Sequence, residues 1–174
     1  SKLSLYTAEC RKTGIKILPP SVNHSGKDFT PDAKTIRFGL LALKNVGRSF
    51  ISSIVREREQ NGSYKSFEDF IFRLKSADIN KRQIEALIKA GAFDSLGKKR
   101  SQLMSKYEEI VDSATNLSRT TAHGQTDIFS MMSDGSDKDV LPQFEYPEIE
   151  EFSKKELLMF EKEVAGIYFS GHIL

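Results

Sequence analysis

The chain has 174 residues, enough for one ordinary domain or for two small ones with a linker, and its 39% hydrophobic residues suffice for a core. Its formal net charge of +2 predicts neither a strong polyanion binder nor an acidic protein, so the distribution of charge matters more than the sum. The single cysteine, Cys10, excludes an internal disulfide framework and suggests a reducing compartment, and no apolar run reaches the roughly 20 residues that span a bilayer.

The first part of the chain, residues 1–39, is rich in turn-forming residues. The stretch "KILPPSVNHSGKDFT" contains a Pro pair and a polar cluster, which favour extended or looped backbone over helix. Two short stretches, "DFT" and "TIRFGL", flank the turn "PDAK". They predict a small β-hairpin at most.

Beyond residue 40 the apolar residues recur at helical spacing. The stretch "RSFISSIVREREQNG" predicts a helix that stops at Gly62, and "SFEDFIFRL" predicts one with Ser66 as its N-cap. A third helix is expected between Asn80 and Gly91, and "KKRSQLMSKYEEIVDSA" predicts a fourth. A last helix is expected over 153–164. We therefore predict a mainly α-helical fold with a small β-hairpin near the N-terminus.

Composition and charge divide the chain further. Residues 115–143 are rich in Ser, Thr, Asp and Gly and show no periodicity, so we expect a flexible linker there. The module before it, residues 40–114, carries most of the clustered basic residues, whereas the segment 144–174 holds seven Glu between positions 145 and 163. The basic module suits a polyanion and the acidic segment does not.

Two stretches of the basic module have the form helix, tight turn, helix. The first, "LLALKNVGRSFISSIV", turns at Asn45, Val46 and Gly47 between the cations Lys44 and Arg48. A glycine lets the backbone turn sharply, and the free N–H groups and dipole of the following helix suit a phosphate oxygen. We interpret this turn as a contact to the DNA backbone that reads no bases.

The second stretch is "LIKAGAFDSLGKKRSQL". Its candidate phosphate contacts are Lys89, Gly91, Lys98, Lys99 and Arg100. A glycine between two helices is usually only a C-cap, so either motif taken alone would indicate structure rather than function. Two such motifs in tandem, with basic residues at both turns, favour a tandem helix–hairpin–helix bundle that binds duplex DNA.

The sequence shows no catalytic constellation. The stretch "GAFDSLGKK" has five residues between its glycines where a phosphate loop has four, and no strand precedes it. The acidic "DKD" at 137–139 lies in Ser/Gly-rich chain with nothing to hold metal-binding carboxylates rigid. His24, His123 and His172 have no partner at ligand spacing. We expect neither a catalytic residue nor a metal site in this chain.

One apolar group interrupts the linker, in the stretch "AHGQTDIFSMM". A polar segment that exposes large apolar residues is either an aggregation hazard or a docking peptide. Gln125 offers a donor and an acceptor, and burial of Ile128 and Phe129 in a cleft is worth roughly 3–6 kcal/mol in transfer terms. Ordering the loop consumes part of this, so one copy should bind at about micromolar strength or weaker. The alternative is that both side chains pack back onto the helices.

Five segments in order resemble one family. They are "GIKILPPSVN", "IRFGLLALKNVG", "NKRQIEALIKAGAFDSLG", "GQTDIF" and "EKEVAGIYFSGH". Over nearly the whole chain they are similar to the catalytic alpha subunits of bacterial DNA polymerase III. The resemblance implies that residues 1–39 end the fingers region and that 40–114 are the tandem helix–hairpin–helix module that grips duplex DNA. Residues 115–143 then carry the clamp-binding peptide, and 144–174 lead toward an oligonucleotide-binding barrel.

The family's clamp-binding pattern is Gln, two variable residues, an aliphatic residue and Phe. In this chain it falls on Gln125, Thr126, Asp127, Ile128 and Phe129. The aliphatic position is commonly Leu or Met in the family, so Ile is a mild departure. The second turn, Ala-Gly-Ala at 90–92, departs further from the family's Gly-apolar-Gly hairpin.

The resemblance implies a non-catalytic segment of a DNA-directed DNA polymerase, because the family's catalytic aspartates belong to its palm domain. The intact subunit would be a nucleotidyltransferase that uses a divalent metal such as Mg²⁺. The implied partners are duplex DNA, the sliding clamp (the beta subunit) and other holoenzyme subunits, in the cytoplasm and without a membrane. Two alternatives stay open, namely a helix–hairpin–helix repair or recombination protein and a pure protein-interaction module.

Overall fold

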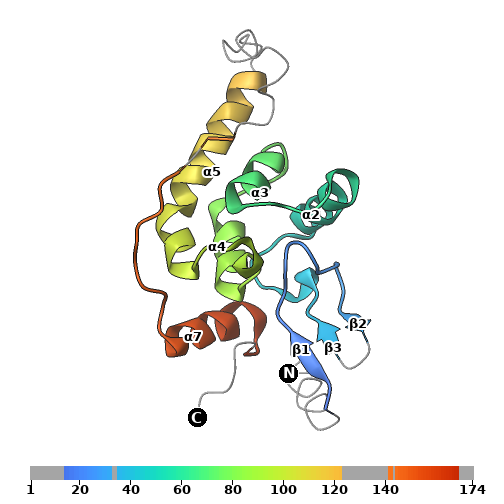
Figure 1. The fold of residues 1–174 in the computed structure, drawn as a ribbon. Helices are drawn as coiled ribbons and strands as arrows, with labels where there is room; N and C mark the ends of the chain where they lie inside the picture. Colours follow the sequence, from blue (N-terminus) through green and yellow to red (C-terminus); the bar gives the residue numbers. More distant parts are fainter. Residues whose placement is uncertain (1–13, 33–34, 123–140, 143, 169–174) are drawn as a thin grey trace.

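A computed structural model of the chain describes residues 14–32, 35–122, 141–142 and 144–168. Within these ranges it is mainly helical, with a small sheet near the N-terminus, as predicted (Figure 1). The helices are α2 (Arg48–Asn61), α3 (Phe67–Arg73), α4 (Lys81–Ala90), α5 (Arg100–Ala122) and α7 (Lys154–Ala165). Two single 3₁₀ turns, η1 (Leu40–Ala42) and η2 (Asp94–Leu96), precede α2 and α5. Helix α4 lies at the centre and contacts both α5 and α7.

The sheet has three strands in the order β1 (Lys16–Leu18), β3 (Thr35–Arg37), β2 (Thr30–Asp32). The antiparallel pair of β2 and β3 is the predicted hairpin, with Pro31 on an edge strand, where a missing N–H is tolerated. Strand β1 pairs with β3 in parallel and was predicted only as extended or looped chain. A three-residue strand whose partner lies far along the chain leaves no local signal.

The predicted N-caps Ser66 and Asn80 are present, and a third N-cap, which the sequence analysis did not predict, forms at α7. The side chain of Ser66 accepts the N–H of Asp69 at 3.0 Å, and that of Asn80 accepts the N–H of Gln83 at 2.9 Å. At α7, Ser153 and Glu156 form a reciprocal capping box. These short side chains satisfy N–H groups that the helix itself leaves without a partner, so the helix starts are fixed by local sequence.

Helix α5 is longer than predicted. It continues past residue 114 to Ala122, through polar residues that the composition assigned to the linker. Ala114 is fully buried and Leu117 packs against the core, so apolar contacts reach into this stretch. Once a helix is nucleated, each further hydrogen bond requires the backbone of only one more residue to be fixed, so polar residues need not stop it.

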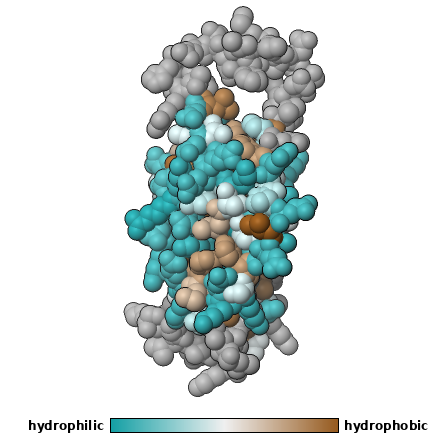
Figure 2. Space-filling model, turned by 90° about the vertical axis from the view of Figure 1, so that its left-hand side faces the viewer, coloured by the Kyte–Doolittle hydropathy of each residue, from teal (hydrophilic) through white to brown (hydrophobic). Residues whose placement is uncertain are grey.

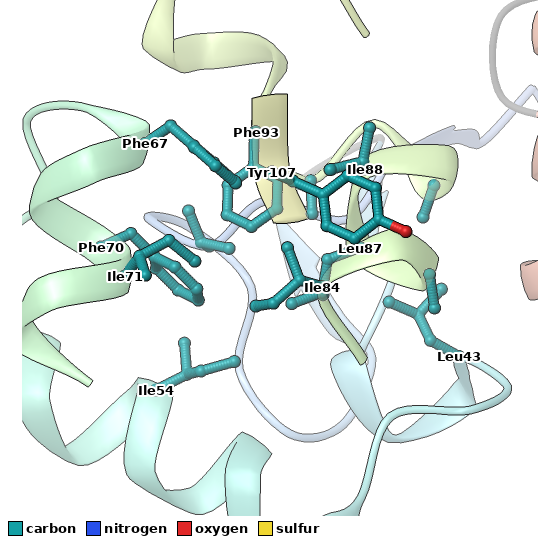
Figure 3. Packing of buried hydrophobic residues seen from close by; sticks show 14 of the residues in the cluster. Leu43, Ile54, Phe67, Phe70, Ile71, Ile84, Leu87, Ile88, Phe93 and Tyr107 are labelled. Carbon is teal, nitrogen blue, oxygen red and sulfur yellow. The ribbon is translucent and has the colours of Figure 1, made fainter. Parts of the chain in front are cut away.

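An aromatic cluster forms the centre of the core (Figure 3). Phe67 and Phe70 from α3 both contact the ring of Phe93, each with ring centroids 4.9 Å apart and in edge-to-face geometry. The N-terminal part shares this core, since Val22 and Phe38 are fully buried in the same cluster. The core therefore runs without a break across the predicted boundary between residues 39 and 40.

Residues 144–152, here called the strap, run in extended form beside α5 and lead into α7 (Figure 1). The side chain of Gln102 donates to the Pro147 carbonyl at 3.1 Å. The Tyr146 hydroxyl donates to the Glu68 carboxylate of α3. The strap is thus held against two helices that precede it by a long stretch of chain.

Candidate nucleic-acid interface

The first hairpin, Lys44–Arg48, lies between η1 and α2. Its sharp turn is made by Asn45, which takes the left-handed conformation with φ 67°, whereas Gly47 has an ordinary φ of −71°. Asn is one of the few non-glycine residues that adopt this conformation readily. The expected short helix before the turn is a single 3₁₀ turn. The turn that the sequence assigned to glycine is therefore made by Asn45.

Gly47 instead lies in close contact with helix α4. Its N–H donates to Oε1 of Gln83 in α4 at 2.7 Å, and a Cβ at Gly47 would lie 3.0 Å from that oxygen. Gln83 is buried, and its own Nε2 donates to the Asp78 carbonyl at 2.6 Å. Helix α4, the first helix of the second helix–turn–helix stretch, thus fixes the position of the first hairpin through the amide side chain of Gln83.

The N-terminal end of α2 is open and positively polarised. Lys44, Asn45, Gly47, Arg48 and Ser49 are all exposed. The first turn of the helix contains no acidic residue. Within the described residues neither Lys44 nor Arg48 takes part in an ion pair. This end of the helix can accept an anion through N–H groups and two nearby cations.

Helix α7 and helix α4 flank the same hairpin. The N–H of Lys44 donates to the Val164 carbonyl at 2.7 Å, which ties the turn to α7. Asn45 and Arg82 line a shallow pocket beside it. Arg82 is exposed, so it adds a cation next to the first hairpin that the sequence analysis did not include. Nothing in the local pattern of α4 marks it, because its proximity to Asn45 arises from tertiary packing.

The second hairpin, residues 91–99, is longer and more elaborate. Helix α4 ends at Gly91 in the left-handed conformation (φ 83°), as predicted, and the turn η2 ends at Gly97 in the same conformation (φ 91°). Gly91 is buried, and a Cβ there would overlap the guanidinium of Arg100. Gly91 is therefore an interior packing position rather than a surface contact.

Arg100 also lies in the interior, only 4% exposed. Its guanidinium donates to Asp94 at 2.8 Å and 3.1 Å and to Glu161 at 2.9 Å. Burial alone would lower the pKa of Arg100, but its hydrogen bonds to Asp94 and Glu161 outweigh that and raise the pKa above its ordinary value. The sequence analysis assigned Arg100 to phosphate contact, and the structure instead places its charge between two carboxylates.

Lys89 is engaged in a similar way. Its side chain is 14% exposed and its ammonium lies 3.0 Å from Glu85 and 3.1 Å from Glu163. Burial lowers the pKa of Lys89, but hydrogen bonds to both carboxylates raise it overall. We therefore leave Lys89, Gly91 and Arg100 out of the interface, since each is used inside the fold.

Lys98 and Lys99 remain at the surface, where both contact the strap. The Lys98 ammonium lies 4.9 Å from the centroid of the Tyr146 ring, and the Lys99 ammonium donates to the Ile149 carbonyl at 3.2 Å. Of the residues assigned from the sequence, the structure thus gathers Lys44, Asn45, Gly47 and Arg48 on one open surface. Lys98 and Lys99 lie on a second surface, where they contact the strap.

Three further findings concern the clamp-binding peptide, metal sites and membrane spans. The peptide Gln125–Phe129 lies outside the described residues. No group of three or more His, Cys, Asp or Glu residues that could hold a metal ion occurs within the ranges described. Among the helices that the structure describes, none is both long and apolar enough to cross a bilayer.

Comparisons with known proteins agree on one kind of relative. A model of the helix–hairpin–helix motif matches residues 14–103. The chain is 42% identical over 175 residues to the DNA polymerase III subunit alpha of Saccharopolyspora erythraea, 38% over 173 residues to that of Borreliella burgdorferi, and 36% over 173 residues to that of Deinococcus radiodurans. Each match covers 99% of this chain but only 13–15% of the relative. The chain therefore corresponds to a small part of these longer proteins.

Proposed function

Because the chain belongs to the helix–hairpin–helix family and corresponds to a segment of the DNA polymerase III alpha subunit, we propose that it binds the backbone of duplex DNA through its first hairpin. The observation that supports this most directly is the open N-terminal end of α2. There, the exposed residues Lys44 and Arg48 flank the turn, and the first turn of the helix contains no acidic residue.

The chemistry of this end suits phosphate and not bases. Backbone N–H groups and the helix dipole attract a phosphate whatever the DNA sequence. The long side chains of Lys44 and Arg48 can reach neighbouring phosphates. Gln83 holds the loop in place without using the N–H groups of Arg48 or Ser49. Such contacts position a duplex and carry no sequence information, as a replication protein that moves along DNA requires.

A binding titration against a duplex oligonucleotide at low salt tests this proposal. The double variant Lys44→Gln/Arg48→Gln removes both cations, and we expect about tenfold or greater loss of affinity with a shallower salt dependence. The control Lys154→Gln/Lys155→Gln removes the same charge from exposed positions of α7 and should change affinity little. Equal affinity of both double variants would show that the hairpin is a scaffold, as in a pure interaction module.

We also propose that Gln125–Phe129 tethers the parent subunit to a sliding clamp. The support is the pattern itself, a hydrogen-bonding amide followed by Ile128 and Phe129 in otherwise polar chain. Binding to a purified bacterial sliding clamp should be weak, about micromolar, and should be lost in Gln125→Ala/Phe129→Ala. The control His123→Ala, just outside the peptide, should bind normally. Unchanged binding of the double variant would refute the tether.

Nucleotide addition belongs, in this proposal, to other parts of the parent subunit. The resemblance assigns the catalytic aspartates to a palm domain, which this segment does not match. In a primer-extension assay with Mg²⁺ and deoxynucleotides, the chain alone should extend no primer. Extension that persists after further purification would contradict the assignment.

A further inference from the structure

The strap covers one face of the molecule. Figure 2 looks onto the face that α5, the strap and α7 form, and in its coloured part hydrophilic side chains surround a limited band of apolar ones. Of the strap's large apolar residues, only Ile149 is exposed, by 40%, whereas Tyr146 and Phe144 pack against the core. The strap's polar contacts, rather than an apolar docking surface, are its distinctive feature.

The most specific contact of the strap is made by Glu151. One oxygen of this carboxylate, Oε2, accepts the N–H of Arg100 at 2.9 Å, and the other, Oε1, accepts the N–H of Ser101 at 2.9 Å. These are the first two residues of α5. A carboxylate therefore occupies the place at this helix end where a phosphate oxygen would bind, and the helix dipole favours both anions alike.

The two surface cations of the second hairpin face the same segment. Lys98 lies over the Tyr146 ring and Lys99 donates to the Ile149 carbonyl, so both are drawn to the strap. Backbone N–H groups and lysines are the groups that a helix–hairpin–helix end offers to phosphate. At this hairpin, all four of them contact residues 146–151.

An independent observation at the same place is the hydroxyl of Ser101. The residue is 5% exposed, and its Oγ is buried and has no hydrogen-bond partner within the described part of the chain. A buried polar group without a partner is unfavourable. The Glu151 carboxylate uses its two oxygens on backbone N–H groups, whereas a phosphate brings further oxygens that can accept from the hydroxyl.

We propose that the strap is a built-in competitor of duplex DNA. Glu151 occupies the phosphate position of the second hairpin, and this helix end binds a backbone phosphate only when the strap lifts. The inference rests on the proposed duplex binding by the first hairpin, which is open where the second is covered. The first hairpin is thus always available to duplex DNA, whereas the second is available only when the strap has lifted.

Duplex affinity tests the competition directly. Glu151→Gln keeps the shape but removes the charge, and Glu150→Gln is the matched control, an exposed neighbour with the same change in net charge. We expect about five- to tenfold tighter duplex binding by Glu151→Gln and a salt slope steeper by about one phosphate contact. The control should stay within about twofold of the unmodified chain. Equal affinities of the two variants would overturn the competition.

A second readout uses inorganic phosphate and no DNA. The backbone amide resonances of Arg100 and Ser101 should shift on titration with phosphate in Glu151→Gln and stay unchanged in the unmodified chain and in Glu150→Gln. Amide dispersion of the free variants verifies that they are folded. No shift in folded Glu151→Gln would overturn the anion position itself. Because this result does not depend on the first hairpin, it stays separate from the Lys44/Arg48 test of duplex binding.

Discussion

Arg100 of α5 and Glu161 of α7 form an ion pair of 2.9 Å in the interior, where their side chains are 5% and 0% exposed. Both charges are largely withdrawn from water, so each needs a partner that compensates it. Asp94 at the hairpin contributes a second carboxylate at 2.8 Å from the guanidinium. The pair links the start of one helix to the interior face of another and fixes how α7 meets the second hairpin.

Removal of the Glu161 carboxylate should therefore destabilise the chain strongly. We expect Glu161→Ala to lower the free energy of unfolding by about 3 kcal/mol, because the guanidinium stays buried with Asp94 as its one remaining carboxylate partner. Glu163→Ala is the control, since its ion pair with Lys89 involves a carboxylate that is 57% exposed and contributes under about 1 kcal/mol. Urea denaturation measures both. A loss no greater than that of the control would contradict the assigned role of the pair.

Gly39 should tolerate no side chain. A Cβ there would lie 2.5 Å from the carbonyl carbon of Asp28 and 2.7 Å from the Lys27 oxygen, both backbone atoms that cannot rotate away. We expect Gly39→Ala to lower the free energy of unfolding by about 2–3 kcal/mol. Gly26→Ala, whose Cβ would meet its nearest atom at an ordinary 3.7 Å, should be nearly neutral. Similar thermal midpoints for the two variants would refute the steric argument.

Gln83 should support duplex binding without touching DNA. Gln83→Ala leaves the Gly47 N–H and the Asp78 carbonyl without their partner, so we expect a loss of about 1–2 kcal/mol in unfolding free energy. Hydrogen exchange at the Gly47 amide should quicken, and duplex affinity should fall as the loop loosens. Gln60→Ala, at an exposed position of α2, is the control for both measurements. Normal Gly47 exchange in Gln83→Ala would contradict this positioning role.

Stability should fall in alkali. Burial raises the pKa of Tyr107 to about 12, with the nearby Glu85 adding to the rise, and burial also raises the pKa of Tyr64 and Tyr146. An unfolded chain releases these protons near pH 10, so between about pH 10 and 12 the folded state holds protons that the unfolded state has lost. The free energy of unfolding should be unaffected by these groups below about pH 10 and fall above it.

Urea titrations at a series of pH values, with tyrosinate absorbance in parallel, measure this effect. The part of the tyrosinate signal that Tyr107→Phe removes should appear together with unfolding, and this variant should show a shallower decline of stability. If that part of the signal appeared near pH 10 while the chain was still folded, the prediction would be contradicted.

The helices and their caps were largely predictable because their determinants are local. Ser66 and Asn80 each cap a helix through an N–H three residues away, and the apolar spacing of α4 fixes its buried face. The β2–β3 hairpin was predictable for the same reason. Strand β1 was not, because the strand with which it pairs, β3, comes from a later part of the chain.

The residues of the candidate site also differ in how far local sequence could place them. Lys44 and Arg48 lie at an exposed helix start, and the sequence placed them there through the turn between them. Arg100 belongs to a run of basic residues that is typical of a solvent-exposed surface. Its ion pairs with Glu161 and Asp94 form only in the folded chain. The contribution of Glu151 at the α5 end was equally hidden, since an acidic segment far along the chain gives no sign of where it lies.

The hydrogen bond from the Lys44 N–H to the Val164 carbonyl decides where this module can be divided. The family match stops at residue 103, yet the turn of the first hairpin is fastened to a helix that begins at Lys154. A shortened version ending near residue 103 would keep every residue of the first hairpin and lose one of its anchors. A version of this module for use in another protein should therefore extend through α7. The stretch that the family model matches, residues 14–103, omits this helix.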